Sequence, residues 1–391
     1  MHVVYARQEP PGVVRTSVFL AGPTPRDPST PSWRPEALRL LAEMPESVDL
    51  VVYVPEPEDG VWTSHYDEQR AWELRFLQSA DLILFYVPRD LTVLPGTVDR
   101  PKMAALTTNV EWGKFYNSGR AVLAYPANVP HLRYLVADAQ DEGVPVFSGD
   151  SALREALRHV VASLGAGADR SAGERDVPLC IWGLPSFQSW YRALVCTGNR
   201  LDAARVLWAF RPSESIFSWV VHVDVYVTAE DRHKKNEFVF ARPDTSAVVA
   251  YCDNSLSENL FDTEVVVVRE FRSPRAGLVR ELPGGSSNTE KSPAQIAAEE
   301  FEQETGVAVG EHRLRHVGER QVGSTLTAHV THVFAVELTR EEIARLKAEE
   351  GVCHGVSPEE QTYVEVRSLC ELLADPVMDW TNLGMILQAI A

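Results

Sequence analysis

The sequence predicts an α/β protein with two domains, each built around a β-sheet. Residues 17–150 alternate short apolar runs with amphipathic stretches that have helical spacing. Residues 219–269 carry successive β-rich runs, which lead into a glycine turn and a glutamate-rich helix. At 391 residues the chain is longer than one hydrophobic core usually accommodates, so two domains are expected.

The N-terminal region is expected to form a doubly wound, five-stranded parallel sheet of the flavodoxin or Rossmann-like kind. Its apolar runs are short and lack strict alternation, which is typical of parallel strands buried on both faces. The helices between them would supply the crossovers. The predicted strands are 17–21, 48–54, 81–87, 121–125 and 144–147, and the predicted helices are 33–44, 66–79, 106–118, 129–141 and 151–164. Ligands bind such sheets beyond the carboxyl ends of the strands, near the switch point.

Composition divides the rest of the chain. Residues 165–177 are small and polar and read as a linker between a domain at 1–164 and a domain at 178–391. Within the second domain, residues 184–210 read as a helical hairpin. Strands are expected after it at 219–227, 237–240, 247–251 and 263–269, and they lead into a glycine turn and a glutamate-rich helix.

Charge and cysteine content restrict the partners. The chain has 37 Lys and Arg against 55 Asp and Glu, a net charge of −18. This balance disfavours nucleic acid polymers and anionic membranes, whereas a small nucleoside or nucleotide can still bind through local arginines. The five cysteines show no CxxC spacing, and no apolar run is long enough to span a bilayer. A cytoplasmic location is expected.

Polar loops follow two of the predicted N-terminal strands. The first is Ala21-Gly-Pro-Thr-Pro25, and the second is Val87-Pro-Arg-Asp90, which leads toward a helix that begins Thr107-Thr-Asn-Val-Glu-Trp-Gly113. We expect Glu111 in the first turn of this helix, where the helix dipole would keep the carboxylate ionised. Nearby amides and the hydroxyls of Thr107 and Thr108 would then hold a sugar or phosphate. The alternative is that Glu111 is an ordinary first-turn acid with one of these threonines as the cap.

Residues 15–150 resemble the nucleoside 2-deoxyribosyltransferase-like family. The resemblance is carried by Phe19-Leu-Ala-Gly-Pro23, Trp72-Glu73 and the Thr-x-x-x-Glu-x-Gly motif that ends at Gly113. It implies that Glu111 is the nucleophile, which agrees with the need for a carboxylate at an oxocarbenium-like centre. The family commonly has Asp six residues earlier, where this chain has Ala105. Asp90 or Asp99 is the alternative source of that carboxylate, or both are plain loop acids.

The remaining candidates in this region have binding or orienting roles. Tyr86 ends its strand and is expected to orient Glu111. Arg34 and Arg89 are read either as bidentate phosphate ligands or as exposed loop arginines. Trp33 and Trp72 are expected to be packing residues. The predicted catalytic residues are Glu111, Tyr86 and Asp90, and the predicted substrate-binding residues are Gly22, Pro23, Arg34, Arg89, Thr107, Thr108 and Asn109. No cofactor is expected for this domain.

A glycine turn, Glu281-Leu-Pro-Gly-Gly285, precedes a carboxylate-rich helix that begins at a Ser292 cap and stops at Gly306. Glu300 and Glu304 are four residues apart and share one helix face, where a divalent cation would relieve their repulsion. We therefore expect Mg²⁺ or Mn²⁺ here, with Glu300, Glu304 and Gln303 as its ligands.

This segment resembles a Nudix box, whose pattern is G-x5-E-x7-R-E-U-x-E-E-x-G-U with U a bulky aliphatic residue. With Gly285 as the first glycine, the spacing fits to the end. Three positions depart from the pattern: Lys291 stands in place of Glu, Glu299 in place of Arg, and Gln303 in place of Glu. The resemblance implies that the C-terminal domain is an α/β/α sandwich with a mixed sheet. The departures predict that this fold is retained with a weakened metal site.

The surrounding residues are similar to the ADP-ribose-hydrolysing branch of that family, through residues 265–272 and 282–285. This similarity implies a nucleoside diphosphate sugar ligand, with Arg272 or Arg280 near phosphate and Gly284 and Gly285 in the binding turn. Glu359 or Glu360 is a candidate for a further carboxylate. Residues 220–227 and 238–240 would form the additional sheet that often mediates dimers in that branch, which leaves a homodimer open.

Together these features predict an enzyme of the N-glycosidase or deoxyribosyltransferase type. Glu111 would act as nucleophile at the N-glycosidic bond of a nucleoside or nucleotide, such as an NAD- or ADP-ribose-related compound. The C-terminal domain would bind, or weakly hydrolyse, a nucleoside diphosphate compound. Two alternatives stay open: a non-catalytic nucleotide sensor, and a Nudix pyrophosphatase with a degenerate box.

Overall fold

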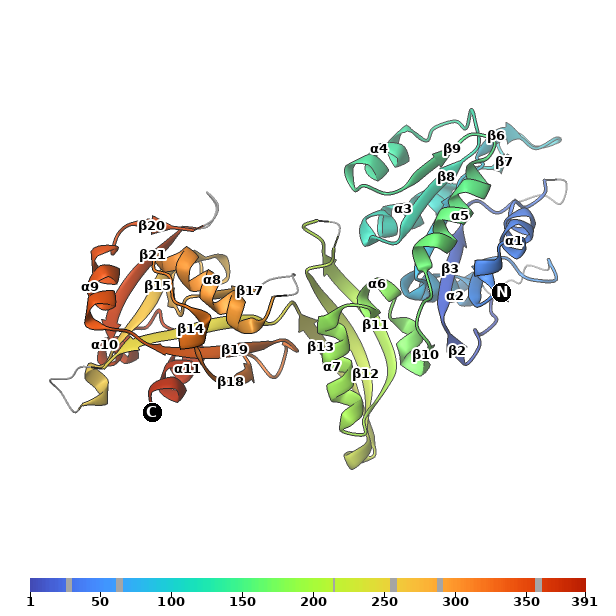
Figure 1. The fold of residues 1–391 in the computed structure, drawn as a ribbon. Helices are drawn as coiled ribbons and strands as arrows, with labels where there is room; N and C mark the ends of the chain where they lie inside the picture. Colours follow the sequence, from blue (N-terminus) through green and yellow to red (C-terminus); the bar gives the residue numbers. More distant parts are fainter. Residues whose placement is uncertain (26–29, 61–65, 214, 254–258, 287–290, 356–360) are drawn as a thin grey trace. The chain divides into compact units, whose positions relative to one another are not determined.

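The computed structural model describes residues 1–25, 30–60, 66–213, 215–253, 259–286, 291–355 and 361–391. The chain divides into two compact units, Met1–Val239 (unit 1) and Phe240–Ala391 (unit 2) (Figure 1). No helix among the described residues is long and apolar enough to cross a membrane.

Unit 1 contains a parallel sheet of six strands in the order β1-β4-β3-β5-β8-β9. These strands are β1 His2–Tyr5, β3 Thr16–Ala21, β4 Leu50–Val54, β5 Leu82–Tyr86, β8 Ala121–Tyr125 and β9 Val146–Ser148. The predicted parallel α/β sheet is confirmed, but the predicted number of five strands is one too few. The additional strand β1 lies at the sheet edge beside β4, and it is only partly buried, so it lacks the continuous apolar run of a central strand.

Helices cover both faces of this sheet. The helices α2 Tyr66–Ser79, α3 Leu106–Phe115 and α4 Arg133–Asp141 pack on one face, where Trp72, Phe76 and Trp112 are the largest buried side chains. The helices α1 Arg34–Ala42 and α5 Ala152–Leu164 pack on the other face. The strand β3 leads to β4 on one side of it, and β4 leads back to β5 on the other side. The chain direction therefore switches between β3 and β5, and a ligand site is expected at their carboxyl ends.

The predicted linker is ordered and tied to the sheet. It contains β10 Arg170–Ser171, which pairs with β2 Val13–Val14, and the short helix η3 Ala172–Asp176. Arg170 is 1% exposed. Helices α6 Leu179–Trp182 and α7 Pro185–Cys196 follow. The two compact units therefore divide after Val239. The predicted boundary at residues 165–177, between domains at 1–164 and 178–391, stays a prediction.

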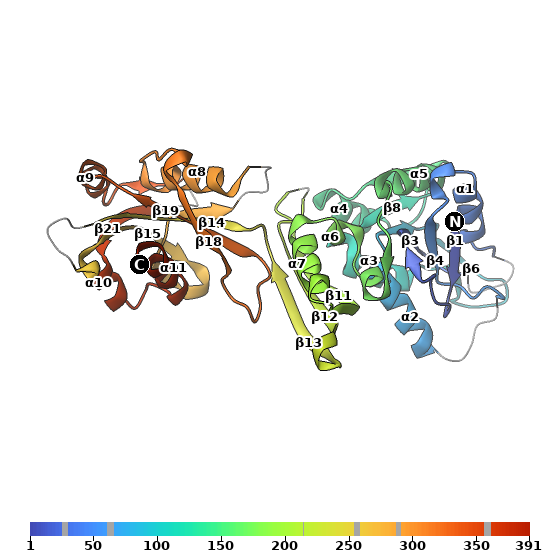
Figure 2. The ribbon, with the colours of Figure 1, turned by 60° about the horizontal axis from the view of Figure 1, so that its bottom comes forward.

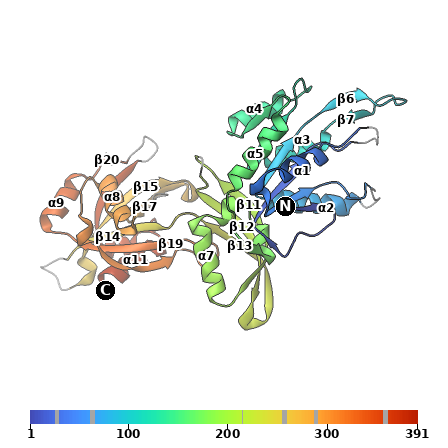
Figure 3. The ribbon, with the colours of Figure 1, turned by 45° about the vertical axis from the view of Figure 1, so that its right-hand side comes forward.

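The predicted helical hairpin at 184–210 is half wrong. Its first part is helix α7, but its second part is strand β11 Arg200–Phe210, in a three-stranded sheet with β12 Ser218–Val227 and β13 Arg232–Ala241. The Ala- and Leu-rich sequence favours a helix locally, but antiparallel pairing with β12 prevails. Helix α7 lies along this sheet (Figure 3). The rings of Phe187 on α7 and Trp219 on β12 are 5.3 Å apart.

Unit 2 is an α/β/α sandwich around an eight-stranded mixed sheet. The strand order is β18-β19-β14-β15-β21-β20, with β16 paired to β15 and β17 paired to β14. Helices α8 and α9 cover one face, and α10 and α11 cover the other (Figure 2). The bounds are β14 Thr245–Cys252, β15 Glu264–Arg272, β16 Gly277–Glu281, β17 Gly284–Ser286, α8 Pro293–Thr305, β18 Arg315–Gln321, β19 Val330–Glu337, α9 Arg340–Ala348, β20 Cys353–His354, β21 Thr362–Ser368, α10 Leu369–Ala374 and α11 Trp380–Ile390.

A buried ion pair fastens the predicted linker to the parallel sheet. Arg170 donates to both carboxylate oxygens of Asp81, at 2.8 and 2.6 Å. Asp81 also accepts hydrogen bonds from the Ser17 hydroxyl and from the Leu179 backbone N–H. Both side chains of the pair are fully buried, so the bidentate geometry and the extra hydrogen bonds are needed to offset the desolvation of two charges.

We predict that Arg170→Met lowers the free energy of unfolding of unit 1 by about 3–5 kcal/mol, because it leaves the Asp81 carboxylate buried without its countercharge. Denaturant unfolding of the full chain measures the change. Arg15→Met is the matched control, since Arg15 is half exposed and its ion pairs are at 3.5 Å; it should cost less than about 1 kcal/mol. Equal effects of the two substitutions would contradict this assignment.

Candidate functional site

The centre of the candidate site in unit 1 is Arg34, the first residue of α1. Its side chain is 1% exposed and lies under the loops that follow β3 and β4. It donates to the backbone oxygens of Leu20 (3.0 Å) and Gly22 (2.8 Å) and to the Thr24 hydroxyl (3.2 Å). It also forms a 2.5 Å ion pair with Glu56, which follows β4. These bonds engage most of the guanidinium donors, so we assign Arg34 a positioning role; phosphate binding by Arg34 stays a prediction.

The loop after β3 needs glycine at its first position. Gly22 has φ +153°, and a Cβ there would lie 2.2 Å from the Tyr86 backbone oxygen and 2.8 Å from the Trp33 ring. The next residue, Pro23, accepts a hydrogen bond from Trp33 Nε1. Trp33 packs on the Tyr86 ring with centroids 5.0 Å apart. The switch point is therefore closely packed, and the carboxyl ends of β3 and β5 meet there.

Two carboxylates lie close enough to Arg34 to interact with its positive charge. Glu111 lies on α3 and Glu73 on α2, and the positive charge of Arg34 acts on both. Burial, together with the negative charge of Glu73, raises the pKa of Glu111 to about 8, although Arg34 and Lys114 oppose the rise. The buried position and the negative charge of Glu73 therefore both favour the protonated form of Glu111 near neutral pH.

The structure corrects the predicted surroundings of Glu111. Helix α3 begins at Leu106, so Glu111 lies in the second turn and not in the first. The N-cap is Ala105 in the left-handed conformation (φ 60°, ψ 30°), with no side-chain cap, so neither Thr107 nor Thr108 caps the helix. The expectation that the helix dipole keeps Glu111 ionised is therefore wrong. The dipole effect fades within the first turn, and burial and a second carboxylate prevail.

Two further predicted residues, Arg89 and Asp90, follow β5. Arg89 donates to Asn109 Oδ1 at 2.6 Å and to the His131 backbone oxygen at 2.6 Å, so it links α3 to the loop before α4. Asp90 accepts hydrogen bonds from the N–H and hydroxyl of Thr92, in the hairpin of β6 Asp90–Val93 and β7 Pro101–Met103. These bonds lower the Asp90 pKa and turn it toward its own hairpin.

The roles of several candidates stay predictions. Thr108 is 2% exposed and Thr107 is exposed. The Tyr86 ring lies on Trp33, and burial raises its pKa; its contact with Glu111 stays a prediction. Trp33 and Trp72 are buried, as predicted for packing residues.

Sequence reasoning missed Glu56 and the electrostatic role of Glu73. The Trp72-Glu73 motif was the available signal for Glu73, whereas nothing in the sequence marks Glu56.

In unit 2, the predicted helix ends are confirmed. Ser292 caps α8 and forms a reciprocal capping box with Gln295, and Gly306 ends the helix with φ 72°. Glu304 accepts a hydrogen bond from the Gly284 N–H at 2.9 Å. A Cβ at Gly285 would lie 2.4 Å from the Glu300 carboxylate, so glycine is needed for this approach. The glycine turn and the carboxylates of α8 are therefore in direct contact.

Two departures from the box pattern turn out to be one ion pair. Lys291 Nζ lies 2.5 Å from Glu299 Oε2. The pattern has Glu and Arg at these two positions, so this chain exchanges the two charges and keeps their attraction. The exchanged pair links the end of the glycine turn to α8, whereas the weakened metal site stays a prediction.

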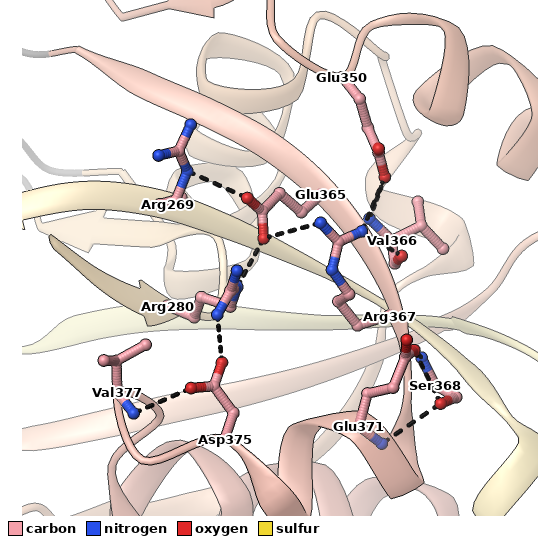
Figure 4. Close-up of polar contacts among 10 residues, drawn as sticks. All are labelled: Arg269, Arg280, Glu350, Glu365, Val366, Arg367, Ser368, Glu371, Asp375 and Val377. Carbon is pink, nitrogen blue, oxygen red and sulfur yellow. Dashed lines mark hydrogen bonds and ion pairs between the residues drawn. The ribbon is translucent and has the colours of Figure 1, made fainter.

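The two arginines predicted near phosphate have carboxylate partners instead. Arg280 pairs with Glu365 (2.5 Å) and with Asp375, on the sheet face that α10 and α11 cover. Arg269 and Arg367 also pair with Glu365, at 3.0 and 3.2 Å (Figure 4). Arg280 thus belongs to a network that joins β15, β16 and β21. Phosphate binding by Arg280 would require these pairs to break.

The residues of unit 2 do not fit the predicted divalent cation. Among the described residues, no three His, Cys, Asp or Glu side chains are grouped so as to hold a metal ion. Gln303, a predicted ligand, is exposed on α8. Glu270 and Glu281, the acids nearest the glycine turn on β15 and β16, are paired with Arg272. Glu359 and Glu360 lie outside the described residues.

Comparison with known proteins addresses part of unit 1. Residues 15–129 match the family model described as nucleoside 2-deoxyribosyltransferase like, and this segment contains Glu73 and Glu111. The match supports a function in nucleoside chemistry and, in general, enzymatic activity of the glycosyl-transfer type. A solved structure described as an ADP compounds hydrolase has 12% identity and a TM-score of 0.34, over 49% of this chain and 91% of that chain. No curated protein gives a significant match.

We predict that Glu111→Gln stabilises unit 1 at alkaline pH. A raised pKa means that the folded state holds the proton more tightly, so ionisation of Glu111 costs stability as pH rises from 4.5 toward about 8. Glutamine removes this cost, by on the order of 2 kcal/mol above pH 8, with no gain near pH 4. Denaturant unfolding at several pH values measures the difference, and a gain that is the same at every pH would refute the stated cause.

We also predict a positive coupling between Lys291 and Glu299. Lys291→Glu and Glu299→Lys should each lower the unfolding midpoint of unit 2, and the double exchange should recover most of the loss. The coupling energy should lie within about 0.2–1 kcal/mol, because both side chains are nearly half exposed. Thermal unfolding of the four proteins measures it. Additive losses would show that the pair does not link the turn to α8.

Proposed function

We propose that unit 1 cleaves, or transfers across, the N-glycosidic bond of a nucleoside or nucleotide, with Glu111 as the nucleophile. The observation that carries the proposal is a partly buried glutamate whose pKa is about 8, beside Glu73 and Arg34 at the switch point of the sheet. A pKa shifted this far by burial and a specific charge is a mark of a catalytic group. The family match over residues 15–129 supports the same class of chemistry.

The proposed chemistry follows from the two carboxylates. Ionised Glu111 would attack C1′ as the bond to the base breaks, and the base would leave with the bonding electron pair and take a proton from water. A water molecule or an acceptor would then displace Glu111 from C1′ and release the sugar. The negative charge of Glu73 raises the pKa of Glu111. We expect Glu73 to take up the proton that Glu111 loses when it becomes the ionised nucleophile. Arg34 holds the loop of Gly22 and Glu56 in place, and its charge favours the ionised form of Glu111.

The experiment is base release from a panel of nucleosides and nucleotides, followed by mass spectrometry of the products. Glu111→Gln should lower kcat by about 10³-fold or more, since it removes the nucleophile. Glu68→Gln, an exposed change on α2, is the control and should leave kcat unchanged. Tight nucleotide binding with no turnover by the wild-type protein would select the alternative, a nucleotide-binding sensor.

A pH profile tests the role of Glu73 separately. If ionised Glu111 is the nucleophile, kcat/KM rises with pH and levels off above about 8, the pKa of Glu111 in the free protein. Glu73→Gln removes the negative charge that raises this pKa, so the rise should move to lower pH. Glu68→Gln should not move it. A rate that falls through pH 8 would make Glu111 a general acid instead.

A further inference from the structure

Arg272, at the end of β15, lies among the carboxylates of unit 2. Its Nε and Nη2 donate to Glu281 Oε2 at 2.9 and 2.7 Å, and its Nη1 donates to Glu270 Oε1 at 3.1 Å. A second contact joins Nη2 to Glu270 Oε2 at 3.0 Å. All three guanidinium nitrogens are therefore bonded to carboxylate oxygens, and both oxygens of Glu270 are engaged.

The charges of α8 belong to the same cluster. The positive charge of Arg272 and the negative charge of Glu270 both act on Glu304, and Glu300 acts on it as well. One Glu304 oxygen already accepts from the Gly284 N–H. A second guanidinium, that of Arg242, interacts with Glu300 and donates to the Ser286 hydroxyl. The two arginines therefore offset part of the negative charge of these four glutamates.

We propose that Arg272 is the resident cation of this cluster, and that it takes the place of a divalent metal ion in unit 2. A divalent cation needs several carboxylate lone pairs directed at one point, and Arg272 already uses those of Glu270 and Glu281. Arginine does not lose its proton in proteins, so its charge is permanent. The carboxylates of Glu270 and Glu281 are therefore engaged by Arg272 without Mg²⁺ or Mn²⁺.

This inference accounts for two other observations. The Gln303 position carries no charge and is exposed, as expected where metal ligation is not required. Arg272 was also a candidate for phosphate binding. All three of its guanidinium nitrogens contact carboxylates, so a phosphate would have to displace these carboxylates. Pairing with Arg272 explains how Glu270 and Glu281 can lie beside each other near the glycine turn without a metal ion.

The test is a Mn²⁺ titration of the full chain, with free Mn²⁺ followed by electron paramagnetic resonance. The Arg272→Gln variant should bind one Mn²⁺ more than the wild-type protein does. The dissociation constant for this ion should be at least about tenfold lower than that of any Mn²⁺ bound by the wild-type protein. The gain should disappear in the double variant with Glu304→Gln. Arg269→Gln is the matched control, because Arg269 lies on the same strand but pairs with Glu365 on the other face, and it should create no Mn²⁺ site.

Two results would overturn the proposal. One is Mn²⁺ binding by the wild-type protein that Glu304→Gln abolishes, which would show that Arg272 does not occupy the metal position. The other is an Arg272→Gln variant that retains the wild-type circular dichroism spectrum and gains no Mn²⁺ site. If the Gln variant does not fold, Arg272→Met, which keeps more of the side-chain volume, replaces it. The wild-type titration does not depend on either variant, so Mn²⁺ binding that Glu304→Gln abolishes would overturn the proposal by itself.

Discussion

A single buried guanidinium organises the candidate site of unit 1. Arg34 connects the loop after β3, through Leu20 and Gly22, to the loop after β4, through Glu56. Its charge also reaches Glu73 and Glu111 on two different helices. An arginine this deeply buried is stable only when its donors and its charge are satisfied, so the positions of both loops and both carboxylates depend on it. The rest of the sheet supplies the frame that brings these groups to one edge.

The same pairing of arginine with carboxylates recurs elsewhere in the chain. Arg170 with Asp81 fastens the segment after α5 to the parallel sheet. Arg280 and Arg269 both pair with Glu365 and so join three strands of unit 2, and Arg272 pairs with Glu270 and Glu281 near the glycine turn. A chain with a net charge of −18 has to place many carboxylates close together. Arginine suits these positions because its planar group can bridge two carboxylates at once.

Much of the fold could be read from local patterns. The five apolar runs and five helical stretches of residues 17–164 correspond to strands and helices of unit 1, and the capping box at Ser292 and the stop at Gly306 are present. The pattern failed at residues 201–208, where helix-favouring residues form β11 because a neighbouring strand pairs with them. It also missed β1, whose short edge position leaves only a weak apolar signal. In both cases pairing with another strand decides the structure: β12, the next strand along the chain, for β11, and the distant β4 for β1.

The sequence by itself determined the classes of structure and the candidate acids. Periodicity, glycine positions and capping residues are local properties, so they indicated the parallel sheet, the carboxyl-end loops, Glu111 and the glutamates of α8. Only the tertiary structure decided the charge state and partners of these groups. It placed Glu73 beside Glu111, moved Glu111 beyond the first turn, and showed Lys291 and Glu299 as one exchanged pair. The reason is physical, because burial and the field of charged neighbours depend on groups that are brought together from distant segments, and no local spacing records them.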